Sequence, residues 1–167
     1  MPQLLQKAGK QLFKKHLQRF APQDPLYECY TDSRGRQRRK QREPPPGLPE
    51  RDAKVLRSVQ RRAHYLDKSF SIAGFRFGWT FLLGIVPLAG DVATALLNYV
   101  LVVRKAREAD IPQALVQHML FNNAVSVGVG LIPLVGDVLL AIYKANSRNA
   151  ALLEKHLKTR VSENVKI

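Results

Sequence analysis

The sequence is poor in acidic residues and in cysteine, and both scarcities limit what the protein can be. It holds 13 Asp and Glu against 27 Lys and Arg in 167 residues, a formal net charge of +14. This imbalance excludes the near-neutral surface of a typical cytosolic enzyme and indicates a polyanionic partner, either nucleic acid or an anionic membrane surface. The single cysteine, Cys29, excludes an intramolecular disulfide and favours a reducing compartment.

Motifs for catalysis and for bound cofactors are also missing from the sequence. No glycine-rich loop ends in Gly-Lys-Ser/Thr, and Gly128–Pro133 has a proline where the dinucleotide fingerprint needs its third glycine. The four histidines lie far apart, without the spacing of metal ligands. We therefore expect no enzymatic activity, no metal and no cofactor.

Charge is distributed unevenly along the chain. Residues 1–70 hold 17 Lys and Arg and 7 Asp and Glu, whereas the apolar blocks 77–103 and 119–143 hold one charged residue each, Asp91 and Asp137. Each block is long enough to cross a bilayer once. Two simple crossings, however, would separate the basic cluster between the blocks from both basic ends, against the positive-inside rule. A reversal of the chain within each block puts all basic regions on one side.

The two blocks contain the same phrase 46 residues apart, Gly84-Ile-Val-Pro-Leu-Ala-Gly-Asp91 and Gly130-Leu-Ile-Pro-Leu-Val-Gly-Asp137. We interpret this repeat as a duplicated helix–turn–helix unit. Proline ends the incoming helix, glycine permits the reversal and aspartate caps the next helix. The predicted turn and cap residues are Gly84, Pro87, Gly90, Asp91, Gly130, Pro133, Gly136 and Asp137. The last helix is expected over Asp137–Thr159.

Three further segments precede the blocks. Residues 1–21 predict a basic amphipathic helix, which either lies on an anionic bilayer or packs on the protein's own core. Residues 22–49 predict a short hairpin and a proline-rich linker. A helix is predicted over Glu50–Phe70, because apolar residues repeat there at steps of three and four. They are Leu56, Val59, Ala63, Leu66 and Phe70. This helix opens a helical domain over 50–160, followed by a tail at 161–167.

The hairpin segment carries a run of basic side chains. These candidate polyanion-binding residues are Arg34, Arg36, Arg38, Arg39, Lys40 and Arg42. A lipid-headgroup patch, a nuclear localisation signal and a solvated loop are all compatible with this run. Sequence-specific recognition of nucleic acid has little support, because the run lacks a groove-reading helix and a pattern of stacking aromatics.

Several motifs occurring in one order resemble the DUF4112 family, a domain of unknown function. They are Arg61-Arg-Ala-His-Tyr-Leu-Asp67, Gly74-Phe-Arg-Phe-Gly78, the paired turn units and Lys144-Ala-Asn-Ser-Arg-Asn149. The resemblance covers residues 55–158, and residues 27–48 look like the extension of fungal members. It implies an all-α, membrane-associated protein without catalytic residues. The polar residues it singles out are His64, Asp67, Arg76, Asn122, Asn123, Lys144, Asn146, Arg148 and Asn149.

The sequence thus predicts an all-α protein of structural or adaptor type at an intracellular membrane. Two helical hairpins pack together and offer a route to self-association, while the basic regions face anionic lipid on the cytosolic side. One alternative is a soluble helical binding module whose basic arm engages nucleic acid or an acidic protein. The other is an ion or proton relay built on Asp91 and Asp137, with Asn122 and Asn123.

Overall fold

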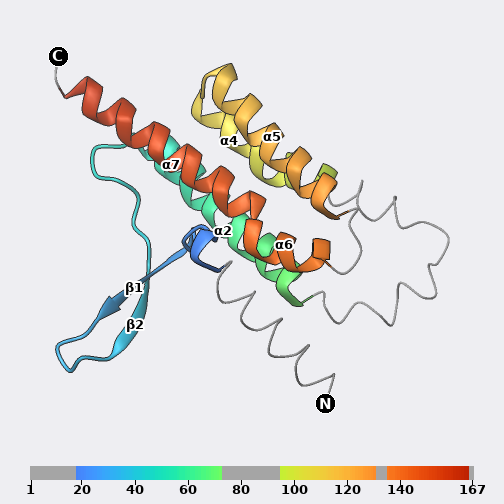
Figure 1. Cartoon of the computed structure of the whole chain (residues 1–167). Helices are drawn as coiled ribbons and strands as arrows, with labels where there is room; N and C mark the ends of the chain where they lie inside the picture. The colour runs from blue at the N-terminus through green and yellow to red at the C-terminus, as the bar shows by residue number, and fades with distance from the viewer. Residues whose placement is uncertain (1–17, 73–94, 131–134, 166–167) are drawn as a thin grey trace.

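Four helical segments form an antiparallel bundle (Figure 1). They are α2 (Glu50–Ile72), segment 95–109, α5 (Gln113–Gly130) and α7 (Ala145–Asn164). The shorter α6 (Val135–Tyr143) precedes α7 and packs against α2 and α5. The computed structural model describes residues 18–72, 95–130 and 135–165. Within these ranges, no helix combines the length and the apolar character that crossing a bilayer requires.

Segment 95–109 is helical but irregular. An α-helical start at residues 95–98 is followed by the π-helical η3 (Tyr99–Val103), then α4 (Arg104–Ala106) and the 3-10 helix η4 (Arg107–Ala109). The left-handed residue Asp110, with φ 52°, ends the segment. Pro112 then opens α5 by accepting the first amides of that helix at its carbonyl oxygen.

The predicted seam of α2 is confirmed. Leu56, Val59 and Ala63 have no exposed surface, and Leu66 packs at the edge of the same cluster. Steps of three and four place these side chains on one face of the helix, toward the other helices. The side chain of Phe70 lies outside the described residues.

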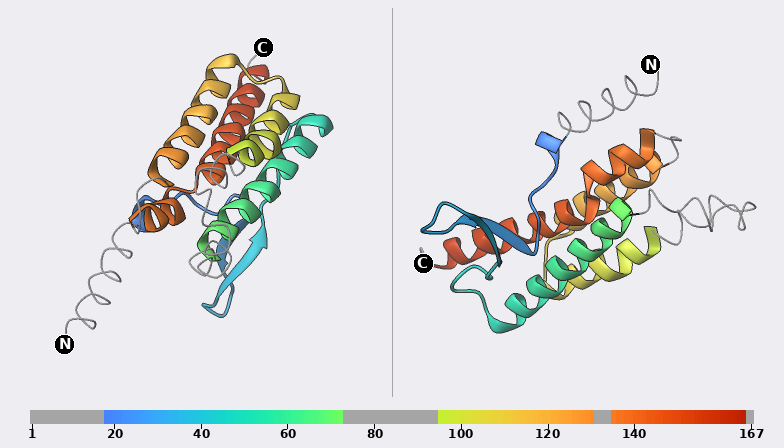
Figure 2. Two further views of the ribbon diagram at one scale, coloured as in Figure 1. Left: turned by 90° about the vertical axis from the view of Figure 1, so that its right-hand side faces the viewer. Right: turned by 90° about the horizontal axis from the view of Figure 1, so that it is seen from below.

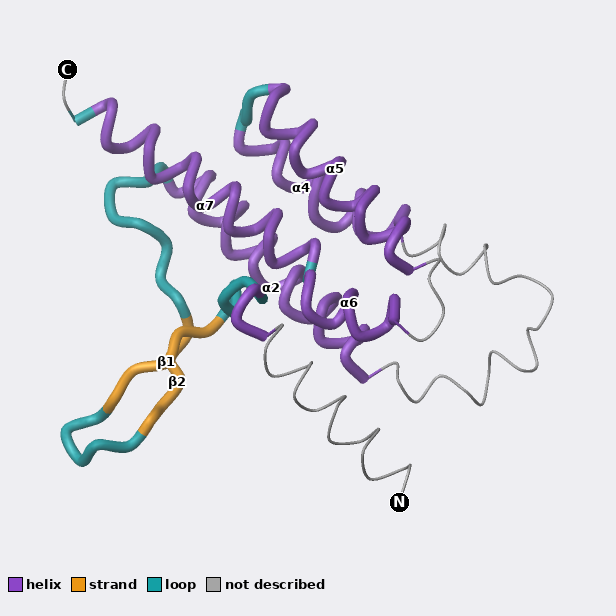
Figure 3. Tube along the Cα trace, in the orientation of Figure 1, coloured by secondary structure: helices purple, strands orange, loops and turns teal. Residues whose placement is uncertain are grey.

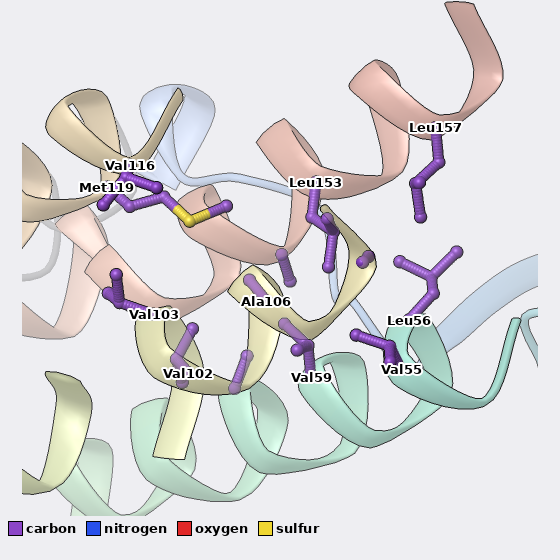
Figure 4. Packing of buried hydrophobic residues seen from close by; sticks show 13 residues of the cluster. Val55, Leu56, Val59, Val102, Val103, Ala106, Val116, Met119, Leu153 and Leu157 are labelled. Atoms are coloured by element: carbon purple, nitrogen blue, oxygen red, sulfur yellow. The ribbon is translucent and has the colours of Figure 1, made fainter. Parts of the chain in front are cut away.

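The apolar core receives side chains from all four helical segments, as Figure 4 shows. The seam of α2 meets small and branched side chains of segment 95–109, α5 and α7. The principal ones are Val102, Val103, Ala106, Val116, Met119, Leu153 and Leu157.

Contacts between α2 and α7 fix their antiparallel orientation. The pairs, in order along α2, are Asp52 with Arg160, Gln60 with Glu154 and Asp67 with Ser147. The end of α2 therefore lies beside the start of α7, where segment 95–109 also begins and α5 ends (Figures 1 and 2). We call this the junction end of the bundle, and the opposite end the distal end.

The N-terminal part adds the predicted β-hairpin, drawn in orange in Figure 3 beside the helices. After the short 3-10 helix η1 (Gln18–Phe20), β1 (Tyr27–Thr31) pairs antiparallel with β2 (Gln37–Gln41). Asp32 stabilises the turn, because its carboxylate accepts the amides of Arg34 and Arg36 at 2.9 Å each. The described part of the chain is therefore mostly helical with one small two-stranded sheet.

The C-terminal helices differ from expectation. The prediction of one helix over Asp137–Thr159 is wrong, because Lys144 has φ 47° and separates α6 from α7. Helix α6 begins at Val135, which places Gly136 and Asp137 inside its first turn instead of before it. Helix α7 continues to Asn164, into the predicted tail.

Much of the predicted duplication falls outside the described residues, and the duplicated turns stay a prediction. The residues concerned are Gly84, Pro87, Gly90, Asp91 and Pro133, together with Arg76 and residues 1–17 of the predicted amphipathic helix.

Candidate functional site

A buried polar cluster occupies the interior of the bundle at its junction end. Its members come from α2, segment 95–109 and α7, and each is at most 5% exposed: Asp67, Asn98, Asn146 and Ser147. Buried polar side chains of this kind are costly unless their hydrogen bonds are satisfied. The cluster therefore has a definite bonding pattern, centred on Asp67.

Asp67 caps α7 from a neighbouring helix. Its Oδ2 accepts the Ser147 amide at 2.7 Å and the Ser147 hydroxyl at 2.5 Å, while its Oδ1 accepts Asn146 Nδ2 at 2.9 Å. Ser147 is the third residue of α7, and Lys144 before the helix makes no side-chain cap. The carboxylate of α2 thus performs the role that an N-cap side chain normally has. This tertiary cap explains why a new helix begins here.

Burial raises the pKa of Asp67 above its ordinary value, against the hydrogen bonds from Ser147 and Asn146, which lower it. Desolvation disfavours the ionised carboxylate, and the donors recover only part of that loss. Keeping Asp67 ionised in this buried position therefore costs free energy.

A second polar cluster joins α5 to α6 and α7. Asn149 donates from Nδ2 to Asn123 Oδ1 at 3.1 Å and to the Met119 carbonyl oxygen at 3.2 Å. Asn122 donates to Asn149 Oδ1 at 2.8 Å and accepts the Tyr143 hydroxyl at 2.8 Å. Four side chains from three helices are thus linked in one chain of hydrogen bonds.

Two buried amide atoms have no hydrogen-bond partner among the described residues, Asn146 Oδ1 and Asn123 Nδ2. Asn146 Nδ2 donates to Asp67 and to Asn98 Oδ1, the latter at 3.2 Å. The oxygen of the same carboxamide accepts no hydrogen bond from the described residues. An orphaned buried acceptor beside a carboxylate is unusual in a folded protein.

Arg148 and His64 hold the N-terminal segment on the bundle. Arg148 donates to the Tyr143 carbonyl oxygen at 2.7 Å and to the Phe20 carbonyl oxygen at 2.9 Å, and its guanidinium lies 4.6 Å from the Tyr143 ring centroid. His64 Nδ1 lies 3.0 Å from Asp24. Burial opposes ionisation of Asp24, but the amides of Leu26 and Tyr27 together with His64 outweigh it and lower the Asp24 pKa. Residues 20–27 are therefore anchored along the bundle.

The outer surface of segment 95–109 and of α5 changes character along the bundle. Toward the junction end the exposed side chains are Leu96, Leu97, Val100, Leu120, Phe121 and Ala124. Toward the distal end the exposed side chains are polar or charged, with the exception of Ala114. They are Arg104, Arg107, Glu108, Gln113, Gln117 and His118. The change occurs at the same height along the bundle on both helices. Ile111 lies in the connection between them, and Arg104 and His118 are each seven residues away from it.

The interior changes in the opposite sense. The apolar core around Leu56, Met119 and Leu153 lies toward the distal end, while both polar clusters lie toward the junction end. The junction half is thus polar inside with an apolar outer face on two of its helices. On α2, the same half exposes Tyr65 and Lys68 instead.

The basic run of the hairpin divides into engaged and available cations. Arg36 and Arg38 pair with Asp32, and Lys40 pairs with Glu28. Arg42 is held within the molecule by Glu154 on α7 and by Gln23, so it fixes the hairpin to the bundle. Arg34 and Arg39 are exposed, with no acidic partner in the part of the chain that the structure describes.

The structure brings together most of the polar residues that sequence analysis singled out. Asp67 and Asn146 meet in the first cluster, and Asn122, Asn123 and Asn149 meet in the second. Sequence analysis missed Asn98, Ser147 and Tyr143 as their partners. Ser147 follows Asn146 within the same motif, and Asn98 is a rare polar residue in block 77–103. Among the described residues, no group of three or more His, Cys, Asp or Glu gathers as a metal site.

Comparison with known proteins places this arrangement in a family. No solved structure matches the chain. An uncharacterised membrane protein of Saccharomyces cerevisiae is 25% identical over 166 residues, which cover 93% of this chain and 67% of the yeast protein. The model of the DUF4112 family, described as a domain of unknown function, matches residues 55–157. These residues include segment 95–109, α5, most of α2 and of α7, and both polar clusters, and the chain belongs to the DUF4112 family.

Proposed function

We propose that this is a membrane-associated helical protein of structural or adaptor type, which places the junction end of its bundle in an anionic lipid membrane. The observation that carries the proposal is the reversal of polarity along the bundle. The distal half has a mainly apolar interior, apart from the α2–α7 contacts of Asp52 and Gln60, and a charged exterior. The junction half combines a polar interior with an apolar outer face on segment 95–109 and α5.

Lipid accounts for this reversal better than water does. In water, each exposed Leu or Phe forgoes about 1.5–3 kcal/mol of burial free energy. Against lipid, the same side chains meet an apolar surrounding, and polar groups must find partners inside the protein. Most polar atoms in the clusters of Asp67 and Asn149 have such partners, the exceptions among the described residues being Asn146 Oδ1 and Asn123 Nδ2.

Basic residues border the apolar face where lipid phosphates are expected. Arg104, Lys105 and Arg107 follow the exposed Leu97 and Val100 on segment 95–109. Each basic residue near an anionic surface contributes about 1 kcal/mol to binding. Tyr65 and Lys68 on α2 are of the residue types that occupy membrane interfaces. The net charge of +14 supports the same partner.

The connectivity supports a reversal within each apolar block. The four described chain ends at Ile72, residue 95, Gly130 and Val135 all lie at the junction end of the bundle (Figure 1). The basic cluster at Arg104–Arg107 then shares one side with the distal parts of α2 and α7, as the positive-inside rule favours. The yeast relative is described as a membrane protein, which supports membrane association.

Finer features of the proposal follow from the sequence. In the proposal, the repeated Pro-x-x-Gly-Asp segments belong to the lipid-facing part, the basic side faces the cytosol of an intracellular membrane, and self-association uses the hairpins. On the β-hairpin, Arg34 and Arg39 contact anionic headgroups, whereas Arg42 serves as an anchor because Glu154 already holds it.

Flotation of the full chain with lipid vesicles tests the proposal. Wild-type protein should float with vesicles of phosphatidylcholine and phosphatidylserine, and less with phosphatidylcholine alone. The variant Leu96→Asp/Phe121→Asp should bind at least about tenfold more weakly, because each change removes about 1.5–3 kcal/mol of apolar transfer free energy. Both residues are exposed, so the fold should persist.

The matched control is Gln113→Asp/Gln117→Asp, which adds the same two negative charges to the polar part of the α5 surface. It should reduce binding only slightly. Equal binding by wild type and the double variant would show that the apolar face does not contribute to membrane binding. Wild-type protein that stays in the soluble fraction and binds nucleic acid or acidic protein would replace our proposal with the soluble binding module.

A further inference from the structure

We propose that the outer face of α2 binds the phosphate groups of anionic membrane lipids, with a preference for headgroups that carry phosphate monoesters. This role rests on the proposed function and refines it, because segment 95–109 and α5 then meet the acyl chains while α2 lies at the headgroups. The face consists of exposed or half-exposed side chains, which we call the cationic face: Arg57, Arg61, Arg62, Tyr65 and Lys68.

The cationic face is a continuous stripe without an acidic side chain. Its members follow one another at steps of three and four along α2, and Arg62 flanks them on the side of segment 95–109. The acid at position 67 is buried toward α7. From the first member to the last, the helix rises by about 16 Å. Four positive charges are thus gathered on one side of a short helical stretch.

These charges are not neutralised within the described ranges of the chain. Arg57, Arg61 and Lys68 make no ion pair with a residue of these ranges. Arg62 donates to the Leu101 carbonyl oxygen at 3.1 Å, a contact that positions its guanidinium without cancelling its charge. The cationic face is therefore available to an anionic ligand.

The distal part of α2 differs from the cationic face. Its exposed cations have acidic partners, since Arg51 pairs with Asp110 and Lys54 pairs with Glu50. Available positive charge on this helix is therefore concentrated toward the junction end, the end that the proposed function places in the membrane.

Two contacts set the height of α2 against segment 95–109, which packs beside it (Figure 2). Arg51 Nε donates to the Glu108 carbonyl oxygen and Arg62 to the Leu101 carbonyl oxygen, each at 3.1 Å. The part of α2 beyond Arg62 therefore lies level with residues 95–100, which expose leucine and valine side chains. At one height, two neighbouring helices present a cationic face and an apolar face.

The boundary between headgroups and acyl chains satisfies both faces at once. Arginine and lysine are disfavoured in hydrocarbon, but at the headgroup level their long side chains reach phosphate. The bundle is then tilted, with α2 nearer the surface. Guanidinium groups bind phosphate through paired hydrogen bonds, and clusters of about four or more Lys and Arg beside a membrane segment are typical of sites for polyphosphorylated lipids.

Flotation with vesicles of defined headgroup tests the ligand class. Vesicles of phosphatidylcholine with phosphatidylinositol bisphosphate are compared with phosphatidylserine vesicles of equal total charge, and the full chain should bind the former more tightly. Arg57→Gln/Arg61→Gln should weaken that binding by about 25-fold, because each basic residue near an anionic surface contributes about fivefold. Arg57→Lys/Arg61→Lys keeps the charge but not the paired hydrogen bonds, so it should lose the preference for the bisphosphate.

The charge-matched control is Lys155→Gln/Lys158→Gln on the exposed surface of α7. It should weaken binding only slightly, and all three double variants should keep the wild-type melting temperature because the changed side chains are exposed. Equal losses from the α2 and α7 glutamine variants would attribute binding to net charge and overturn the site. Tighter binding to soluble inositol trisphosphate or to duplex DNA than to vesicles would also overturn it.

Position-specific quenching tests the orientation. In a Cys29→Ser background, a fluorophore is attached at Lys68→Cys or at Phe121→Cys, and the lipids carry nitroxides on the headgroup or on the acyl chain. Headgroup nitroxides should quench the label on α2 more strongly, and acyl-chain nitroxides the label on α5. Equal depth of both labels would overturn the orientation. Absence of flotation with any vesicle would overturn the proposed function as well, whereas normal flotation that the α2 variants leave unchanged would overturn the cationic face alone.

Discussion

Leu56 illustrates the residues that hold the distal half of the bundle together. It has no exposed surface and belongs to the core cluster with Val103, Leu153 and Leu157. Leu56→Ala removes buried apolar atoms and leaves a cavity, so it should lower the free energy of unfolding by about 2–5 kcal/mol in urea denaturation. Leu96→Ala is the control, because Leu96 is 58% exposed. Its effect on the free energy of unfolding should stay within about 0.5 kcal/mol. An equal loss of stability from Leu56→Ala and Leu96→Ala would show that Leu56 is not part of the core.

Lys144 is a residue whose backbone matters more than its side chain. Its φ of 47° lies in the left-handed region, which costs residues other than glycine about 1–2 kcal/mol. Lys144→Gly should therefore raise the free energy of unfolding by about 1 kcal/mol, and Lys144→Val should lower it, because a branched side chain tolerates this conformation poorly. Urea denaturation of both variants measures the effect. A loss of stability from glycine would show that the Lys144 side chain makes the larger contribution.

Single polar residues could be recognised from the sequence, but their pairing could not. Asp67 and Ser147 lie 80 residues apart in the chain, and Asn122 and Asn149 lie 27 apart. Hydrogen bonds over such separations follow from the packing of whole helices, which no local pattern encodes. The sequence therefore indicated candidate residues, and only the folded bundle divides them into two clusters.

At the scale of elements, local signals predicted the structures that depend on local interactions. The seam of α2 has a helical period of apolar residues, and the hairpin has an Asx turn at Asp32 with Gly35 at φ 72°. The break between α6 and α7 has no such signal, because Lys144 is neither glycine nor asparagine. It depends on the tertiary cap that Asp67 supplies.

The hairpin offers a prediction that separates anchoring from binding. Arg42→Gln removes the contact with Glu154, so limited proteolysis should cut residues 22–49 faster than in wild type. Arg39→Gln leaves that contact intact and should not change proteolysis. It should weaken binding to anionic vesicles, by about 1 kcal/mol at low salt. The opposite assignment, with Arg42→Gln affecting only lipid binding, contradicts the described hairpin contacts.

At the scale of the whole molecule, the sequence indicated where apolar and basic residues lie but not how they face one another. Block 77–103 ends, and block 119–143 begins, at the height along the bundle where the outer surface changes between apolar and polar. The opposite change of the interior became visible only in the fold, because it depends on Asp67, Asn98 and Asn146 meeting between helices. This inside-out arrangement of the junction half is the main support for a lipid environment.

Fluorescence of Trp79 tests the central claim most directly. It is the single tryptophan of the chain and belongs to block 77–103. If the junction end enters the membrane, its emission should shift to shorter wavelength with anionic vesicles, and lipids brominated on their acyl chains should quench it. High salt should weaken binding by screening the basic residues. Unchanged emission and no quenching, with the protein shown by flotation to be on the vesicles, would contradict insertion of this end.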